Sequence, residues 1–193
     1  MESVKKEART LEIRYTLNEN DFLNLQLYLA SNDENFKKQR TKDKYRIVIL
    51  SLLFGLILFF DSGYNLYSYY FLGSALVFLL IHPWWSKYFY KRIFKSRVIG
   101  SLKNSLPQTI SLTLREESID LINKENIRSF YIQDLQAIIE IQDYFFFMQV
   151  SDSPPIIIPK KEIANISIIY EQLEQYHKDF NIPFIKDLQY KWK

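Results

Sequence analysis

The chain has 193 residues, of which 48% are hydrophobic and 24% charged, and its formal net charge is +3 at pH 7. It contains no cysteine, which excludes a disulfide scaffold and a thiolate metal site. Its four glycines form neither a G-x-G-x-x-G motif nor a P-loop, which argues against a glycine-rich nucleotide site.

Residues 1–44 are predicted to form a strand followed by a helix on the cytoplasmic side of a membrane. Between Leu11 and Leu17, apolar and polar residues alternate strictly, which is typical of a half-buried strand. Asn18 then offers a helix N-cap, with Asp21 three residues later in an arrangement close to a capping box. Apolar residues recur at helical spacing after it. We expect this helix to break near Ser31 and to resume through the basic stretch that follows.

Residues 45–86 are predicted to form a transmembrane helical hairpin. Two apolar runs, 45–60 and 66–85, flank the turn sequence DSGYN, and residues 47–86 contain no lysine or arginine. A spanning helix needs about 20 apolar residues, so the second run is long enough and the first is short. Aromatic residues cluster near the turn and at the end of the second run, as in the belts at membrane interfaces. The alternative, two buried helices of a soluble protein, is disfavoured because neither run carries a polar stripe.

Small residues predict that the two helices pack closely. Ser51 and Gly55 are four residues apart, a spacing that lets helix backbones approach each other. In a hairpin centred near Ser62, Ser51 is expected to face Gly73. Pro83 is expected to end or kink the second helix.

The distribution of lysine and arginine predicts the orientation. Six cations lie in residues 37–46 and six in residues 87–103, whereas the turn between the runs has none. Cytoplasmic flanks are enriched in such residues, so both termini are expected in the cytoplasm. We expect no cleavable signal peptide, and the first spanning helix is expected to direct insertion.

Residues 105–193 are predicted to form a small α+β domain. Alternating segments near residues 110–114, 119–121, 127–132, 136–141, 144–150 and 156–158 predict strands, and apolar residues at helical spacing from 163 to 176 predict a terminal helix. The expected fold is a small antiparallel sheet or partial barrel closed by that helix. The run from Tyr144 to Phe147 would place rings on both faces of a strand. One face belongs in the core, and the other must meet the helix, the membrane surface or a second chain.

The chain also resembles a known family in three blocks: LEIRYTLNENDF, the apolar pair with its basic flanks, and YIQDLQAIIEIQDYFFFMQVSDSPPIIIPKKEI. The most specific positions are Asp134-Leu135, Glu140, the strand Tyr144–Val150 and Ile158-Pro159-Lys160-Lys161. These resemble the YcxB-like family of bacterial membrane proteins. The resemblance implies a bacterial inner-membrane protein in which a two-helix hairpin carries a pleckstrin-homology-like (PH-like) cytoplasmic domain. The chain departs from the family at Ile132, where tryptophan is common. The family has no established activity, so the resemblance implies fold and topology only.

Two sets of cations are candidate contacts for anionic lipid. Residues 87–104 are predicted to form a basic juxtamembrane helix, in which spacings of three and four place the first set on one face. This set comprises Lys87, Lys91, Arg92 and Lys95. Lys160 and Lys161 form the second set, just before the start of the terminal helix, where the helix dipole favours anions. The alternatives are charges that serve only topology in the first set and a solvated helix start in the second.

No constellation of residues predicts catalysis, a cofactor or a metal site. The two histidines, His82 and His177, are far apart in sequence and lack any metal-binding motif. We therefore expect a non-enzymatic, membrane-anchored binding or scaffolding module without nucleic-acid binding. Its partners would be the lipid bilayer and an unidentified protein or a second copy of the chain. The alternative is an immunity or stress-tolerance protein whose hairpin acts on another membrane protein. A lipid-modifying enzyme ranks third, because no acid–base pair supports it.

Overall fold

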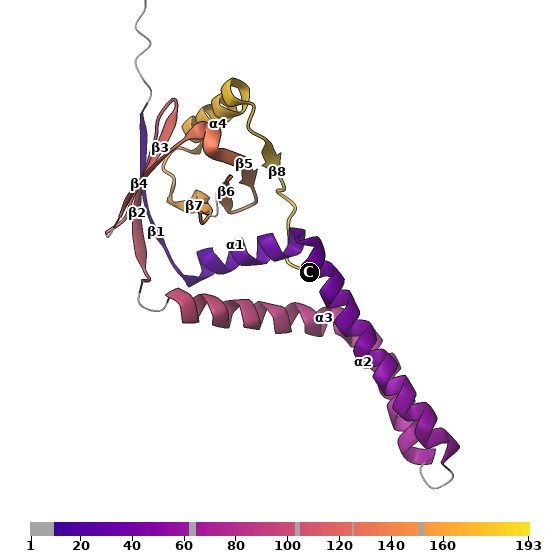
Figure 1. The fold of residues 1–193 in the computed structure, drawn as a ribbon. Coiled ribbons are helices and arrows are strands. Elements are labelled where there is room, and N and C mark those ends of the chain that lie inside the picture. Colours follow the sequence, from indigo (N-terminus) through magenta and orange to yellow (C-terminus); the bar gives the residue numbers. More distant parts are fainter. Residues whose placement is uncertain (1–9, 62–64, 103–104, 125, 151–152) are drawn as a thin grey trace, which may run out of the picture. The chain divides into compact units, whose positions relative to one another are not determined.

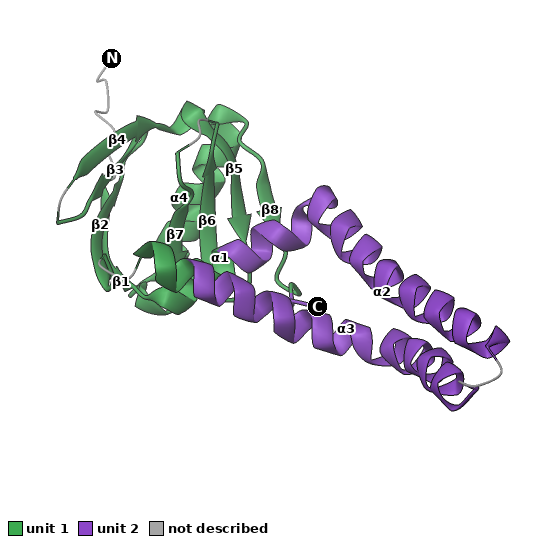
Figure 2. Cartoon of the chain, turned by 60° about the horizontal axis from the view of Figure 1, so that its bottom comes forward, with its two compact units in different colours: residues 1–25, 98–190 green, residues 26–97, 191–193 purple. Residues whose placement is uncertain are grey.

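The computed structural model describes residues 10–61, 65–102, 105–124, 126–150 and 153–193. The chain is of the α+β class and divides into two compact units, shown in different colours in Figure 2. Residues 1–25 and 98–190 form the first, here called the sheet unit, and residues 26–97 and 191–193 form the second, the helix unit. Two of the boundaries fall within helices, α1 (Glu19–Asn32) and α3 (Asn65–Leu102), and the third follows Tyr190 in the C-terminal segment.

The first sheet of the sheet unit is fully antiparallel. It contains β1 (Leu11–Leu17), β2 (Gln108–Leu114), β3 (Ser118–Ile122) and β4 (Ile127–Tyr131), in that order. β1 pairs with β2 along its whole length, from Leu11 opposite Leu114 to Leu17 opposite Gln108. The N-terminal strand therefore completes a sheet whose other strands all follow α3 in the sequence.

The second sheet has the order β7-β6-β5-β8 (Figure 1). Its strands are β5 (Leu135–Glu140), β6 (Tyr144–Gln149), β7 (Ile156–Pro159) and β8 (Phe184–Lys186). The expectation of a single antiparallel sheet is thus corrected, because the described strands form two sheets and β8 pairs in parallel with β5 in the second. β8 has three residues, too few to show alternation in the sequence.

The terminal helix α4 (Ile166–Phe180) contacts the second sheet and the turn that follows β2. The Tyr170 ring packs edge-on against the ring of Phe145 in β6, with their centroids 5.5 Å apart. The Tyr176 hydroxyl donates a hydrogen bond to the carbonyl of Arg115, just after β2. All four aromatic residues of the run from Tyr144 to Phe147 are buried. The sequence left three possible neighbours for the second face of this strand, namely the terminal helix, the membrane surface or a second chain. Over Phe145, the observed neighbour is α4.

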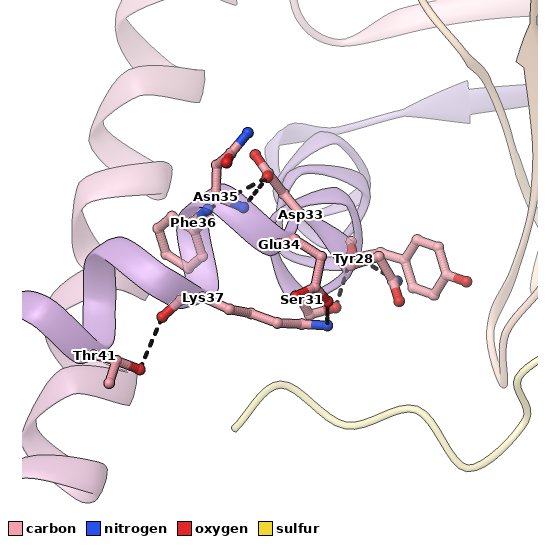
Figure 3. Close-up of polar contacts among 9 residues, drawn as sticks. Tyr28, Ser31, Asp33, Glu34, Asn35, Phe36, Lys37 and Thr41 are labelled. Carbon is pink, nitrogen blue, oxygen red and sulfur yellow. Dashed lines mark hydrogen bonds and ion pairs between the residues drawn. The ribbon is translucent and has the colours of Figure 1, made fainter.

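The helix unit contains the second half of α1, the whole of α2 (Glu34–Phe60) and most of α3. Asp33 separates α1 from α2 and caps the second helix, as Figure 3 shows. Its carboxylate accepts hydrogen bonds from the backbone N–H groups of Asn35 and Phe36, at 2.8 and 3.3 Å. This satisfies two donors that a helix start leaves unpaired. The helix break predicted near Ser31 is therefore confirmed, and it lies two residues later, at Asp33.

Helices α2 and α3 pack against each other through small residues. The Ser68 hydroxyl donates to the Gly55 carbonyl at 2.8 Å, and the hydroxyls of Ser51 and Ser74 are 3.1 Å apart. A Cβ atom at Gly55 would lie 2.8 Å from Leu72, so the contact requires glycine. The predicted partner of Ser51 was Gly73, which is wrong by one residue. Because one residue turns a helix by about 100°, Gly73 is exposed instead.

Helix α3 continues through Pro83 rather than ending there. Figures 1 and 2 show that it bends between its two ends. A proline inside a helix removes one backbone hydrogen bond and displaces the preceding turn, which accounts for a bend of this kind. The predicted basic helix 87–104 is thus the second half of one helix that ends at Leu102.

Candidate membrane interface and buried charge cluster

Among the described residues, one helix is long and apolar enough to cross a membrane by length and composition. This is α3, whose most apolar stretch has a mean hydropathy of 1.4 and is only 17% buried within the protein. The first half of α2 is rich in lysine and arginine, so its apolar part is confined to residues 47–60. Two spanning helices were predicted. Among the described residues, α3 alone meets the requirements of length and of apolar composition.

The outward faces of α2 and α3 are apolar. Ile57 is 65% exposed, Phe60 84% and Leu80 82%, and many of their neighbours are similarly exposed. The hydroxyls of Ser51, Ser68 and Ser74 instead lie between the helices. A helix pair in water places its polar groups outward, and large exposed apolar patches mark interaction surfaces. The observed arrangement is the one that a hydrocarbon environment favours.

The predicted basic set on α3 is exposed to solvent. It comprises Lys87, Lys91, Arg92 and Lys95. The aromatic residues that precede and interleave with it are exposed as well, with Trp84 at 68% and Tyr88 at 69%. These cationic and aromatic side chains are therefore open to solvent along the second half of α3.

One flanking cation of α2 has a different role. The Arg40 guanidinium donates to the buried Ser86 hydroxyl at 2.5 Å and to the Lys193 carbonyl at 2.8 Å. It also lies 5.6 Å from the Trp192 ring centre. Arg40 therefore links α2, α3 and the C-terminal residues within the helix unit.

Trp192 is a further contact residue that the sequence did not suggest. Its indole N–H donates to the Lys87 carbonyl at 3.0 Å, and its ring lies near Phe36 and Phe94, with centroids 6.3 and 6.2 Å away. The only sequence signal was an aromatic residue between two terminal lysines, which matches no periodic pattern.

The sheet unit contains a buried charge cluster centred on Glu140. Its side chain is 1% exposed, and Oε1 accepts a hydrogen bond from the Lys160 ammonium at 2.7 Å and another from the Tyr170 hydroxyl. Desolvation, followed by the hydrogen bond to Glu140, raises the pKa of Tyr170 to about 12. The Lys160 ammonium also lies 4.9 Å from the Phe145 ring centre. Among the described residues, no partner bonds Oε2 of Glu140.

This cluster changes the interpretation of the second set of candidate lipid contacts. Lys160 and Lys161 lie in a short 3-10 turn, Lys160–Glu162, and α4 begins only at Ile166. Lys160 is 12% exposed and neutralises Glu140, whereas Lys161 is 63% exposed beside Glu162. Lys160 was predicted to contact an anion at a helix start. This prediction is corrected, because the Lys160 ammonium is already paired with Glu140.

The structure also gives roles to the positions that carry the family resemblance. Glu140 and Lys160 form the buried ion pair, although they are 20 residues apart in sequence. Asp134 accepts a hydrogen bond from the Tyr131 N–H at 3.3 Å and closes a 3-10 turn before β5. Ile132, where the family often has tryptophan, is fully buried. The contacts of Glu140, Lys160, Asp134 and Ile132 all lie within the sheet unit, where they contribute to its folding.

A second polar link joins α1 to β6 inside the sheet unit. The Tyr144 hydroxyl donates to Asp21 at 2.8 Å, and the other Asp21 oxygen accepts from the Asn18 N–H at 2.7 Å. The capping arrangement predicted for Asn18 and Asp21 is thus confirmed, since Asn18 also accepts from the Asn20 N–H at 2.9 Å. Desolvation and the bond to Asp21 raise the pKa of Tyr144 to about 12.

Comparison of the chain with family models, with curated proteins and with solved structures finds no match.

Proposed function

We propose that the protein is a membrane-anchored binding module, in which α2 and α3 cross a bacterial cytoplasmic membrane as a hairpin and the sheet unit binds a partner in the cytoplasm. The observation that carries the proposal is the polarity of the helix pair, with hydroxyls inside and apolar side chains outside. Exposing that surface to water would oppose folding and promote aggregation, whereas lipid solvates it.

The short apolar part of α2 is compatible with crossing. Residues 47–60 extend over about 20 Å at about 1.5 Å per residue, against a hydrocarbon core of about 30 Å. Lys44 and Arg46 lie directly before them, and such side chains extend toward the headgroups from within the membrane edge. Local thinning of the bilayer would supply the remainder.

The flanking charges support cytoplasmic termini and a contact with anionic lipid. The four exposed cations on α3, defined above, repeat along one face beside exposed aromatic rings. Each cation near an anionic surface contributes about 1 kcal/mol. Lys161 is the remaining exposed candidate in the sheet unit.

The proposed binding role of the sheet unit rests on its architecture and on the YcxB-like resemblance. Two small sheets and a helix near the C-terminus that packs against the second sheet are elements expected of a PH-like domain. Such a domain is a platform for protein or lipid ligands, and this is why we propose binding rather than catalysis.

Cysteine labelling tests the topology, because the natural chain has no cysteine. The predicted turn centre, Ser62, lies outside the described residues, so the adjacent Asp61 is the better site. In intact cells, an impermeant thiol reagent should label Asp61→Cys but not Lys124→Cys, which is exposed in the sheet unit. Permeabilised cells should give labelling of both. Labelling of Lys124→Cys alone in intact cells would reverse the orientation, and equal labelling of both would exclude a spanning hairpin.

A further inference from the structure

The sheet unit contains a cavity that the proposed topology does not use. It has a volume of about 250 Å³ and lies against strands of both sheets. Apolar side chains form most of its lining, including Leu17, Phe22, Leu121 and Phe130 of the first sheet and its neighbouring helix, and Ile156 of the second sheet. A cavity with such walls favours an apolar ligand or part of one.

One position on its wall departs from this apolar pattern. Across the first sheet, Ile13 pairs with Leu112, Leu112 with Leu121, and Leu121 with Arg128. Directly paired residues lie on the same face of a sheet, so Arg128 occupies the end of a row whose other members are apolar. The next inward residue of β4 is Phe130, paired with the fully buried Ile119. Arg128 is exposed, so the charged end of this row opens toward solvent while its other members face the interior.

Arg128 has no counterion in the described part of the chain. It is exposed and forms no hydrogen bond or ion pair with another described residue. Among the described residues that line the cavity, it is the single charged one, accompanied by the amides of Gln108, Asn123 and Gln149. The cavity thus joins an apolar interior to one fixed positive charge.

We propose that this cavity binds a medium-chain fatty acid, with its alkyl chain among the apolar side chains and its carboxylate on Arg128. At about 30 Å³ per water-sized group, 250 Å³ holds roughly eight such groups, which suits an alkyl chain of that order. Guanidinium matches carboxylate geometry with two parallel hydrogen bonds, and the neighbouring amides add donors. The proposal supplies a ligand for the proposed binding module and rests on that role, but not on the membrane topology.

Native mass spectrometry of the full-length protein, released from a mild detergent after incubation with decanoic acid, tests the proposal. One decanoate should bind per chain. Arg128→Ala should weaken binding at least about tenfold, as expected for loss of a charge-assisted hydrogen bond, and Arg128→Lys should restore part of it. Arg14→Ala is the matched control, because Arg14 is an exposed residue on the opposite face of the same sheet, and it should bind decanoate like the natural chain.

Further probes define the chemistry and place of binding. Decanol should bind at least about tenfold more weakly than decanoate, and decyltrimethylammonium should not compete, since Arg128 repels it. A decanoic acid with a diazirine near its methyl end should crosslink to peptides that line the cavity. Crosslinks confined to α2 and α3 would overturn the proposal, as would equal loss of binding in Arg14→Ala and Arg128→Ala. A phospholipid-mass adduct that excess decanoate cannot displace would show a membrane lipid as the occupant and would also overturn it. None of these results depends on labelling at Asp61.

Discussion

At the scale of single residues, Glu140 and Lys160 show how a charged pair is tolerated in the core of the sheet unit. The carboxylate is almost completely buried, and its position at the end of β5 places it opposite the turn after β7. Such a pair need not stabilise the fold relative to an apolar pair, but removing one member leaves the other charge unpaired.

We expect Lys160→Met to lower the free energy of unfolding of the detergent-solubilised protein by about 3–5 kcal/mol, because it leaves the Glu140 carboxylate without its counterion. Lys161→Met is the matched control and should change it by less than about 0.5 kcal/mol, since Lys161 is largely exposed. Adding Glu140→Gln to Lys160→Met should recover part of the loss in denaturant titrations. Equal effects of the two lysine substitutions would show that the buried pair is not formed.

Tyr144 and Tyr170 predict a loss of stability at high pH. Burial and carboxylate hydrogen bonds raise the pKa of each from 10.0 to about 12. Above pH 10 the unfolded chain releases these phenolic protons while the folded protein retains them, so the unfolded state gains. The free energy of unfolding should therefore fall between pH 10 and pH 12. Burial also raises the pKa of Tyr15 and Tyr176, so these two residues should extend the fall to higher pH.

The measurement is denaturant unfolding in detergent at several pH values across this window. Tyr144→Phe should make the decline shallower, because the residue no longer titrates, even though its stability at neutral pH is lower through loss of the bond to Asp21. Tyr131→Phe, at an exposed tyrosine, should leave the decline unchanged. A decline that is just as steep in Tyr144→Phe would rule out this explanation.

At the scale of elements, the pairing of α2 with α3 depends on one close contact. A Cβ atom at Gly55 would meet Leu72 at 2.8 Å, whereas one at Gly73 would meet no atom within 4 Å. Gly55→Ala should therefore force the helices apart, with a cost of about 1–3 kcal/mol. Gly73→Ala should be neutral or slightly stabilising, because alanine is the better helix former.

The two glycine variants can be compared by their thermal unfolding midpoints in the same detergent. A second readout is disulfide formation between Ser51→Cys and Ser74→Cys, whose natural hydroxyls are 3.1 Å apart. Gly55→Ala should slow this crosslink, and Gly73→Ala should not. If both variants behave alike, the helices do not pack through Gly55.

Elements with a repeating pattern were predictable from the sequence. The alternation of Leu11–Leu17, the spacing along α4 and the capping residues Asn18 and Asp21 are local signals, and the structure has the corresponding elements. β8 was missed because three residues carry no period, and its parallel pairing depends on where α4 ends. The packing partner of Ser51 was misplaced by one residue, because helix rotation is set by side-chain packing rather than by the turn centre alone.

The candidate sites were less predictable, because they depend on residues that are distant in sequence. Lys160 was expected to face solvent, and only the fold places Glu140 beside it. Arg128 looked like an ordinary polar residue of a strand, and its significance comes from its register with Leu121 and Leu112. Trp192 matches no periodic pattern in the sequence, and its contacts are with the distant residues Lys87, Phe36 and Phe94.

At the scale of the whole molecule, the two units differ in where their large apolar side chains lie. The sheet unit has a conventional core, with fully buried residues such as Leu112, Phe146 and Leu173. The helix unit carries its large apolar side chains outward along residues 47–60 and 66–89. A chain built in this way is expected to need a lipid environment for one unit while the other folds in water.

Spin-label depth profiling along α2 in liposomes tests this account most directly, because α2 is the helix whose crossing depends on the proposal. Labels would replace the exposed residues Ile47, Leu50, Phe54, Ile57 and Phe60 one at a time. Accessibility to oxygen relative to a water-soluble nickel reagent should rise from Ile47 to a maximum near Phe54 and fall again toward Phe60. The same series in urea should show no maximum. A profile in liposomes without a maximum, with high nickel accessibility at Phe54, would contradict a spanning α2 and with it the proposed anchor.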